Sequence, residues 1–407
     1  MKQMTSRERV LAALNFEPVD RLPKDLGGMA STGISAFAYL KLVAALGLPY
    51  RKPRVYDTYQ MLAYPDADVL DALGCDVACI YWGSTNELPE SGKWHDYDFN
   101  GRLDAQVRYP EDFEVLEDGT IVQPKKKLTM PPSSVVFDEE HGGQSLDYDS
   151  WPHPDLDKLR KDLEAGLLSE EQVQESVDHC KLVRESTDRA IFFNGPVMIG
   201  TAIGGWGGMG IYPMFCMLEP ELAEELHELT TEYAVKQVER LLPAIAPYID
   251  IVMMASDDWG TQNSLIASPD VYEELFKPYQ RQVNEACHRV APEVKTFLHS
   301  CGAIYPILDG IIEAGFDIIN PIQWSAGGHS YKEWKDKCRG RIAMWGGGVN
   351  SQVTLPLGTV EDVAREAGEV SAYLAQDSGY VFNNIHNILA EIEPEKIIAM
   401  YNAASDV

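Results

Sequence analysis

Short apolar runs alternate with longer stretches of helical periodicity along most of the chain. Eight runs rich in β-branched or aromatic residues predict buried strands, at 21–26, 76–82, 190–195, 248–256, 294–301, 316–323, 341–348 and 379–387. Several are separated by stretches with helical spacing and capping residues, at 268–290, 305–315 and 359–376. Strands that alternate with helices are typical of a parallel sheet. The pattern predicts an α/β fold, a (β/α)₈ TIM barrel that forms a single domain over residues 1–407, although a doubly wound open sheet gives a similar local pattern.

The chain opens with a predicted helix ahead of the first strand. Thr5 and Glu8 have the spacing of a capping box, and Val10, Leu11 and Leu14 follow at helical intervals. We therefore expect an N-terminal helical extension to the barrel.

Residues 84–150 break the alternation. This stretch has short alternating segments, the turn sequence EDGT at 117–120 and many Asp and Tyr residues, which predict hairpins inserted after the second strand. An insertion there would sit at the rim where the strands end, so it is interpreted as a lid over the site. A surface elaboration or a homodimer contact explains it equally well.

Composition restricts the partners. The chain has 63 acidic and 34 basic residues, a formal charge of −29, which would repel nucleic acid and anionic membranes. No run of about 18 apolar residues and no signal peptide is visible, so we expect a cytoplasmic protein that crosses no membrane. Seven scattered cysteines, an odd number, indicate reduced side chains.

Polar side chains collect where the predicted strands end, and in a barrel these ends converge on one mouth. Five of them are predicted to contact substrate: Asp25, Asn194, Gln323, Trp345 and Asn384. Asp257 and Asp258 follow the fourth strand, and two adjacent carboxylates can position a donor or act in acid catalysis, so they are the predicted catalytic residues. Alternatively, one of the two caps a turn or the next helix.

His299 and Cys301 form the sharpest pair. Residues two apart on a strand point to the same face, so an imidazole and a thiolate here could share one metal ion, with zinc favoured. Catalytic zinc takes three protein ligands and keeps one position open. His386 on the eighth strand is the predicted third ligand, with Asp257 or Asp258 as the alternative.

Several segments resemble the uroporphyrinogen decarboxylase superfamily. They are RERVLAALNFEPVDRLP at 7–23, DDWGTQ at 257–262, SPDVYEELFKPY at 268–279, the long motif at 297–323, WGGGVNSQVTLP at 345–356 and NNIHNILAEIEPEKIIAMYNA at 383–403. The resemblance spans nearly the whole chain outside 84–150. It implies a (β/α)₈ barrel and either porphyrinogen decarboxylation or zinc-dependent methyl transfer with corrinoid proteins or thiols.

Residues at two places favour the methyltransferase branch. The decarboxylases carry an arginine-rich motif after the first strand, where this chain has DLGGMASTGIS at 25–35 without arginine, and His299 and Cys301 match the His-x-Cys of the methyltransferases. Those relatives place a cysteine where this chain has His386. One thiolate fewer leaves a zinc ion more positive and a stronger Lewis acid, which suits a methoxylated or methylamine-type donor better than a thiol.

The resemblance thus implies O-demethylation or a related reaction. Zinc on His299, Cys301 and His386 would bind the leaving heteroatom of a small methyl donor, and a corrinoid (cobalamin) would take the methyl group. No corrinoid-binding motif of the DxHxxG type is visible, so a separate corrinoid protein is the expected partner. The competing hypotheses are a cofactor-free decarboxylase, with lysines 125–127 in place of the missing arginines, and a non-catalytic binding barrel.

Overall fold

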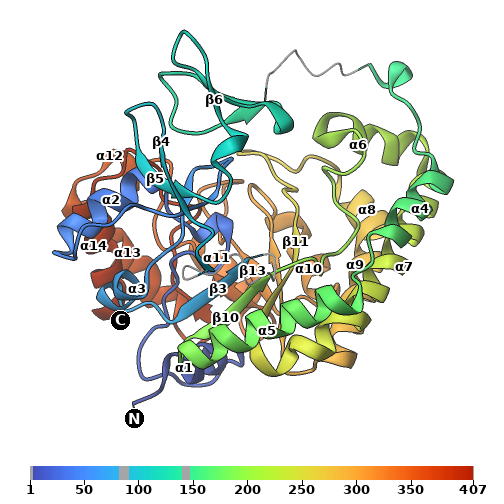
Figure 1. Cartoon of the computed structure of the whole chain (residues 1–407). Helices are drawn as coiled ribbons and strands as arrows, with labels where there is room; N and C mark the ends of the chain where they lie inside the picture. The colour runs from blue at the N-terminus through green and yellow to red at the C-terminus, as the bar shows by residue number, and fades with distance from the viewer. Residues whose placement is uncertain (1–2, 82–90, 140–146, 407) are drawn as a thin grey trace.

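The computed structural model describes residues 3–81, 91–139 and 147–406. Its core is a curved sheet of seven parallel strands in the spatial order β15–β14–β13–β12–β11–β10–β3 (Figure 1). In chain order they are β3 (Val77–Tyr81), β10 (Ala190–Asn194), β11 (Ile251–Ser256), β12 (Lys295–His299), β13 (Ile318–Asn320), β14 (Ala343–Trp345) and β15 (Tyr380–Val381). Each lies within one of the apolar runs of the sequence.

The eighth position is held by the segment around Lys24. Lys24 pairs with Phe382 in parallel, and its carbonyl accepts the amide N–H of Asp76, immediately before β3, at 2.7 Å. The segment therefore links β15 to β3 and closes the barrel, which confirms the predicted fold class. It is much shorter than the strand expected at 21–26, because Pro23 offers no N–H to a ladder and Gly27 turns the chain away at φ +80°.

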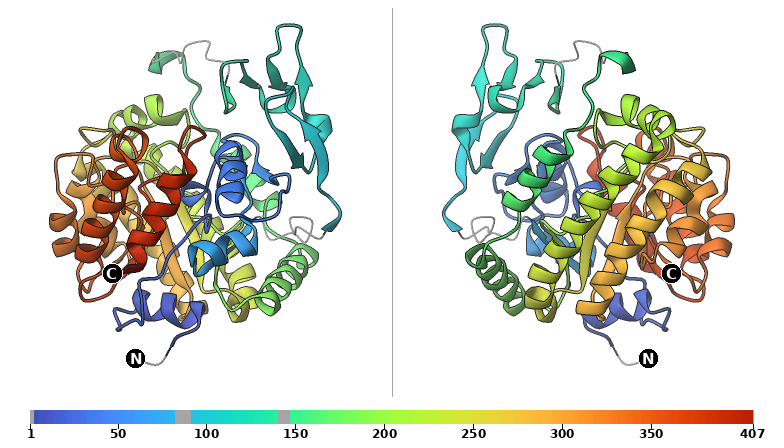
Figure 2. Two further views of the ribbon diagram at one scale, coloured as in Figure 1. Left: turned by 90° about the vertical axis from the view of Figure 1, so that its left-hand side faces the viewer. Right: turned by 90° about the vertical axis from the view of Figure 1, so that its right-hand side faces the viewer.

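Helices surround the sheet on its outer side (Figure 2). They are α2 (Ala36–Ala45), α3 (Ala67–Leu73), α4 (Leu156–Ala165), α5 (Glu170–Ser186), α6 (Gly208–Leu218), α7 (Pro220–Ile245), α8 (Pro269–Val271), α9 (Lys277–Val290), α10 (Leu308–Glu313), α11 (Tyr331–Cys338), α12 (Thr354–Leu357), α13 (Val360–Leu374) and α14 (Pro394–Ala403). A π-helical turn over Tyr272–Phe276 joins α8 to α9, so the helix predicted at 268–290 is present with one irregular turn. In the described part of the chain, no helix has both the length and the apolar character needed to cross a bilayer.

Helix α1 (Ser6–Leu14) lies across the amino-terminal end of the barrel. Its capping box is present as predicted, with Thr5 accepting from the backbone N–H of Glu8. Val10 and Leu14 are buried against side chains inside the barrel. Arg9 pairs with buried Asp76 at 2.6 Å. An apolar face and an ionic contact therefore close this end, and the predicted site residues lie at the other.

The inserted region stands at the opposite end of the molecule from α1 (Figure 2). It contains an antiparallel pair, β4 (His95–Asp98) with β5 (Asp104–Val107), and an antiparallel sheet of β6 (Glu114–Val115), β7 (Ile121–Gln123), β8 (Leu128–Met130) and β9 (Asp138–Glu139). Both pack near the hairpin of β1 (Val55–Asp57) and β2 (Leu62–Ala63). Its role as a lid or dimer contact stays a prediction.

Candidate metal centre

Two strand ends bring three potential metal ligands together. His299 is the last residue of β12, Cys301 follows it by two positions, and His386 lies beyond β15. One ligand atom from each, a ring nitrogen of either histidine or the cysteine sulfur, lies within 4.8 Å of the other two. The ring centroids of His299 and His386 are 5.8 Å apart. Three residues far apart in the sequence thus converge at the carboxyl end of the barrel.

The geometry of this cluster fits zinc. The Sγ of Cys301 lies 3.3 Å from Nε2 of His299, close to the ~3.5 Å that separates two ligands of a tetrahedral zinc ion. Imidazole and thiolate are ligands that zinc prefers, and three of them leave a fourth position for substrate. The three side chains could therefore hold a catalytic zinc ion.

Burial favours the uncharged forms of His299 and Cys301. Desolvation lowers the pKa of His299, although the nearby carboxylate of Asp258 partly opposes this effect. Desolvation also raises the pKa of the Cys301 thiol, and Asp258 adds to that rise. Because a thiol must ionise to bind a metal, a zinc ion would displace a proton from Cys301 on binding.

The turn that carries Cys301 is held by two of the predicted site residues. Asp258 Oδ1 accepts the backbone N–H of Cys301 at 2.8 Å, and Gln323 Oε1 accepts that of Gly302 at 2.6 Å. Asp258 also lies 3.6 Å from Nε2 of His299, with 46% of its side chain exposed. Asp258 is therefore both next to the potential metal ligands and open to a bound molecule.

Asp257 has a different environment from Asp258. It is buried, and it accepts hydrogen bonds at 2.8 Å from the backbone N–H of Ile203 and from the indole N–H of Trp259. Burial raises its pKa to about 7, although these hydrogen bonds lower it. The Asp257 carboxylate thus anchors the loop after β10, and its predicted catalytic role stays a prediction.

The remaining residues predicted to contact substrate are hydrogen-bonded within the protein. The indole N–H of Trp345 donates to Asp25 at 3.0 Å, and Asn194 donates to the carbonyl of Gly28 at 2.8 Å. Asp25, Trp345 and Asn384 are fully buried, and Asn384 donates to the carbonyl of His386. These three side chains are covered by the protein, and substrate contact for the whole set stays a prediction.

Asp25 gives a testable pH dependence. Burial raises its pKa to about 6, against the lowering effect of hydrogen bonds from Thr32, Trp345 and Gly28. The folded protein therefore binds more protons than the unfolded chain between about pH 4 and pH 6, so Asp25 costs up to about 3 kcal/mol of stability as pH rises through that window. Denaturant unfolding should show wild type losing stability relative to Asp25→Asn between pH 4 and pH 7.

Asp20 provides a control of opposite sign. Its hydrogen bond from Arg9 holds its pKa well below the ordinary value, so its contribution is present above about pH 4 and is lost as pH falls. Wild type should therefore lose stability relative to Asp20→Asn only in acid. Stability profiles of wild type and Asp25→Asn that run parallel from pH 4 to pH 7 would contradict the Asp25 prediction.

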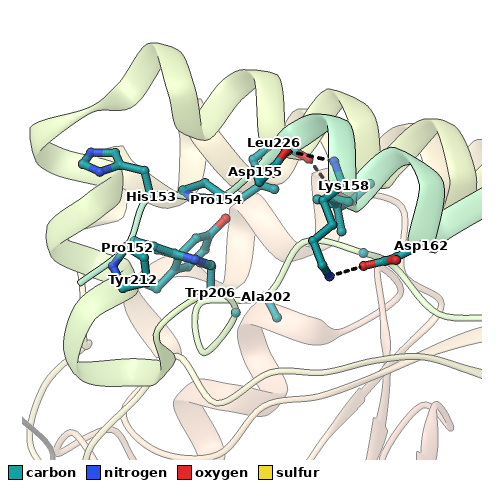
Figure 3. Close-up of a pocket in the computed structure, with 14 residues that line it drawn as sticks. Pro152, His153, Pro154, Asp155, Lys158, Asp162, Ala202, Trp206, Tyr212 and Leu226 are labelled. Carbon is teal, nitrogen blue, oxygen red and sulfur yellow. Dashed lines mark hydrogen bonds and ion pairs between the residues drawn. The ribbon is translucent and has the colours of Figure 1, made fainter.

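A separate pocket of about 330 Å³ lies beside the loop that Asp257 anchors (Figure 3). Trp206 and Tyr212 form one side of it, and Lys158, paired with Asp162 at 2.6 Å, lies on the other. None of the predicted site residues lines this pocket. It is therefore distinct from the metal-ligand cluster.

Two asparagines at the cluster are absent from the residues expected from the sequence. Asn320 Oδ1 lies 2.6 Å from Nδ1 of His299, and Asn387 Oδ1 lies 2.6 Å from Nδ1 of His386. Asn320 ends β13 and Asn387 directly follows His386. Their positions at strand ends were the available signal, since a polar side chain there faces the same mouth as the ligands.

Comparison with known proteins agrees with this architecture. Residues 129–407 match the family model described as Uroporphyrinogen decarboxylase (URO-D). Curated relatives include uroporphyrinogen decarboxylases from Chlorobium chlorochromatii (strain CaD3), 28% identical over 188 residues, and Legionella pneumophila (strain Corby), 24% identical over 184. These matches cover 44% and 45% of this chain and 47% and 49% of the relatives, so they span about half the length of the curated proteins.

A solved methyltransferase from Methanosarcina mazei is similar over 99% of both chains, with a TM-score of 0.57 and 20% sequence identity. At that identity the likeness bears on the fold. The two proteins therefore share the fold over almost their whole length.

Proposed function

This chain belongs to the uroporphyrinogen decarboxylase family, and on that premise we propose that it is a zinc-dependent methyltransferase. It would move a methyl group between a small methoxylated or methylamine-type donor and a corrinoid carried by a partner protein. The convergence of His299, Cys301 and His386 within 4.8 Å carries the proposal. A cofactor-free decarboxylase has no use for such a ligand set.

The first βα loop also favours methyl transfer over decarboxylation of a polycarboxylate. Recognising several substrate carboxylates calls for arginine or lysine side chains, and the segment 27–35 has none. Of the three lysines at 125–127 that could replace the arginines, Lys125 pairs with Asp112 at 2.7 Å and Lys126 donates to Thr58 at 3.1 Å.

Within the proposed reaction, the protein's own residues bind and orient. His299, Cys301 and His386 would hold zinc, which supplies Lewis acidity toward the donor's leaving heteroatom. Asp258, half exposed beside His299, is placed to orient the donor. Asp257 fixes the loop around Ile203 at the same rim. A corrinoid on the partner protein would supply the nucleophile that accepts the methyl group, while the bonding electron pair would stay on the leaving heteroatom, which would take up a proton from solvent.

The proposal is tested by metal content and by methyl transfer in the same preparation. We expect about one zinc ion per chain after reconstitution, and conversion of free cob(I)alamin to methylcobalamin with methoxylated or methylamine donors, followed by absorbance. Release of carbon dioxide from uroporphyrinogen is measured in parallel. A protein that takes up no zinc and releases carbon dioxide would overturn the proposal in favour of decarboxylation.

A further inference from the structure

In both histidines of the cluster, one ring nitrogen is hydrogen-bonded to an asparagine side chain. In each case the Oδ1 of the asparagine lies 2.6 Å from Nδ1 of the imidazole, which is a short hydrogen bond. An amide oxygen only accepts a hydrogen bond, so with the two amides oriented this way Nδ1 of each histidine carries the proton. Nε2 is then the unprotonated nitrogen, and it is the atom left free to bind a metal.

The orientation of the Asn320 amide is fixed from its other side. Its Nδ2 donates to the backbone carbonyl of Trp345 at 3.0 Å, and a carbonyl cannot donate in return. The Oδ1 of Asn320 therefore has to face His299. Asn320 is fully buried, so no water competes for this position. His299 is thus held by the barrel wall itself, through β13 and β14.

The amide of Asn387 has a different anchor. Its Nδ2 donates at 2.8 Å to Oε1 of Gln60, which lies in the turn between β1 and β2. That turn is bound by the inserted sheet, because Gln123 donates to the carbonyl of Thr58 at 2.8 Å and the backbone N–H of Phe137 donates to the carbonyl of Tyr59 at 3.0 Å. His386 is therefore connected to the insertion through two side-chain amides.

We propose that Asn320 and Asn387 position the two histidine ligands as Nδ1–H tautomers, and that Gln60 ties one of them, His386, to the inserted sheet. A partner of this kind fixes the ring orientation and the tautomer of a metal-bound histidine. An amide acceptor, unlike a carboxylate, adds no negative charge, so the ion keeps more of its Lewis acidity. The inference rests on the proposed metal site, but the tautomers exist without the metal.

The tautomers are read directly from ¹⁵N NMR of histidine-labelled, metal-free protein, in which protonated and unprotonated ring nitrogens have distinct shifts. His299→Ala and His386→Ala assign the two signals. We expect both rings as Nδ1–H in wild type. Asn320→Ala should change the tautomer of His299 alone, and Asn387→Ala should change that of His386 alone. Unchanged tautomers in both variants would overturn the proposal, whether or not the protein binds zinc.

Zinc affinity, measured by competition with a chromophoric chelator, provides the second readout. Each Asn→Ala variant should bind zinc about 10–100-fold more weakly, the usual cost of losing such a partner. Asn284→Ala is the matched control, because Asn284 is also fully buried but donates to the carbonyl of Ala314 on the outside of the barrel. It should bind zinc like wild type. Equal affinities in all variants would overturn the positioning role, whereas no binding by wild type would overturn the proposed function.

Two further variants separate positioning from general disruption. Asn387→Asp keeps an oxygen acceptor for His386, and the Gln60 amide can turn its NH₂ toward the new carboxylate, so the Nδ1–H tautomer and zinc binding should be restored. Gln60→Ala should shift the His386 signal and leave that of His299 unchanged. An unchanged His386 signal in Gln60→Ala would show that the insertion does not position this histidine.

Discussion

If the proposed function holds, Cys301→Ala protein is expected to bind no zinc on reconstitution and to lose methyl transfer by more than about 100-fold, which exceeds the usual cost of removing a residue that only supports a ligand. Cys301 supplies the one thiolate of the cluster, and its sulfur lies 3.3 Å from Nε2 of His299. Only two of the three protein ligands that a catalytic zinc ion needs would remain, so the variant should bind zinc weakly. Metal content and methylcobalamin formation measure both losses.

Cys338→Ala is the matched control for this variant. Cys338 is a buried thiol at the end of α11, on the outside of the barrel. Its removal should leave zinc content unchanged. His299→Ala and His386→Ala should behave like Cys301→Ala. Full zinc content in any of the three ligand variants would show that the ion binds elsewhere.

Gly302→Ala is expected to lower the free energy of unfolding by about 4 kcal/mol and to displace Cys301. Gly302 has φ +90°, where an alanine is strained, and a Cβ there would overlap the backbone of Gly260. Strain at such a position and overpacking each cost about 1–3 kcal/mol. The neighbouring hydrogen bond from Gly260 N–H to the carbonyl of Cys301, at 3.1 Å, would be disturbed. The free energy of unfolding, measured with denaturant, and the affinity for zinc should both decrease.

Gly368→Ala controls for the substitution itself. Gly368 lies within α13, and a Cβ there meets no atom within 4 Å. Alanine favours a helix over glycine, so this variant should be slightly more stable than wild type. If Gly302→Ala matched wild type in stability and zinc affinity, the close approach of the Gly302 and Gly260 backbones would not be what positions Cys301.

The order of strands and helices was determined by the sequence itself. Periodicity reports local environment, and seven of the eight predicted runs contain a parallel strand of the barrel. The capping box of α1 and the hairpins of the insertion were equally local signals. The first strand was overestimated, because an apolar run does not show how Pro23 and Gly27 limit pairing.

Only part of the candidate site could be predicted from the sequence. His299 and Cys301 could be paired from their spacing on one strand, since side chains two apart share a face. His386 lies 85 positions beyond Cys301, and the sequence left Asp257 and Asp258 as alternatives for the third ligand. Barrel closure brings β12 and the end of β15 to one mouth, and this brought His386 within reach.

Tertiary structure alone distinguished the two adjacent aspartates and revealed the asparagines. Asp257 and Asp258 are the same residue type at adjacent positions. Asp257 is nevertheless buried and accepts from the backbone N–H of Ile203, whereas Asp258 is half exposed beside His299. Asn320 and Asn387 acquire their roles from which atoms surround each amide. Periodicity along a chain records which face of an element is buried, whereas the partner of a polar side chain is set by elements that meet only when the barrel closes.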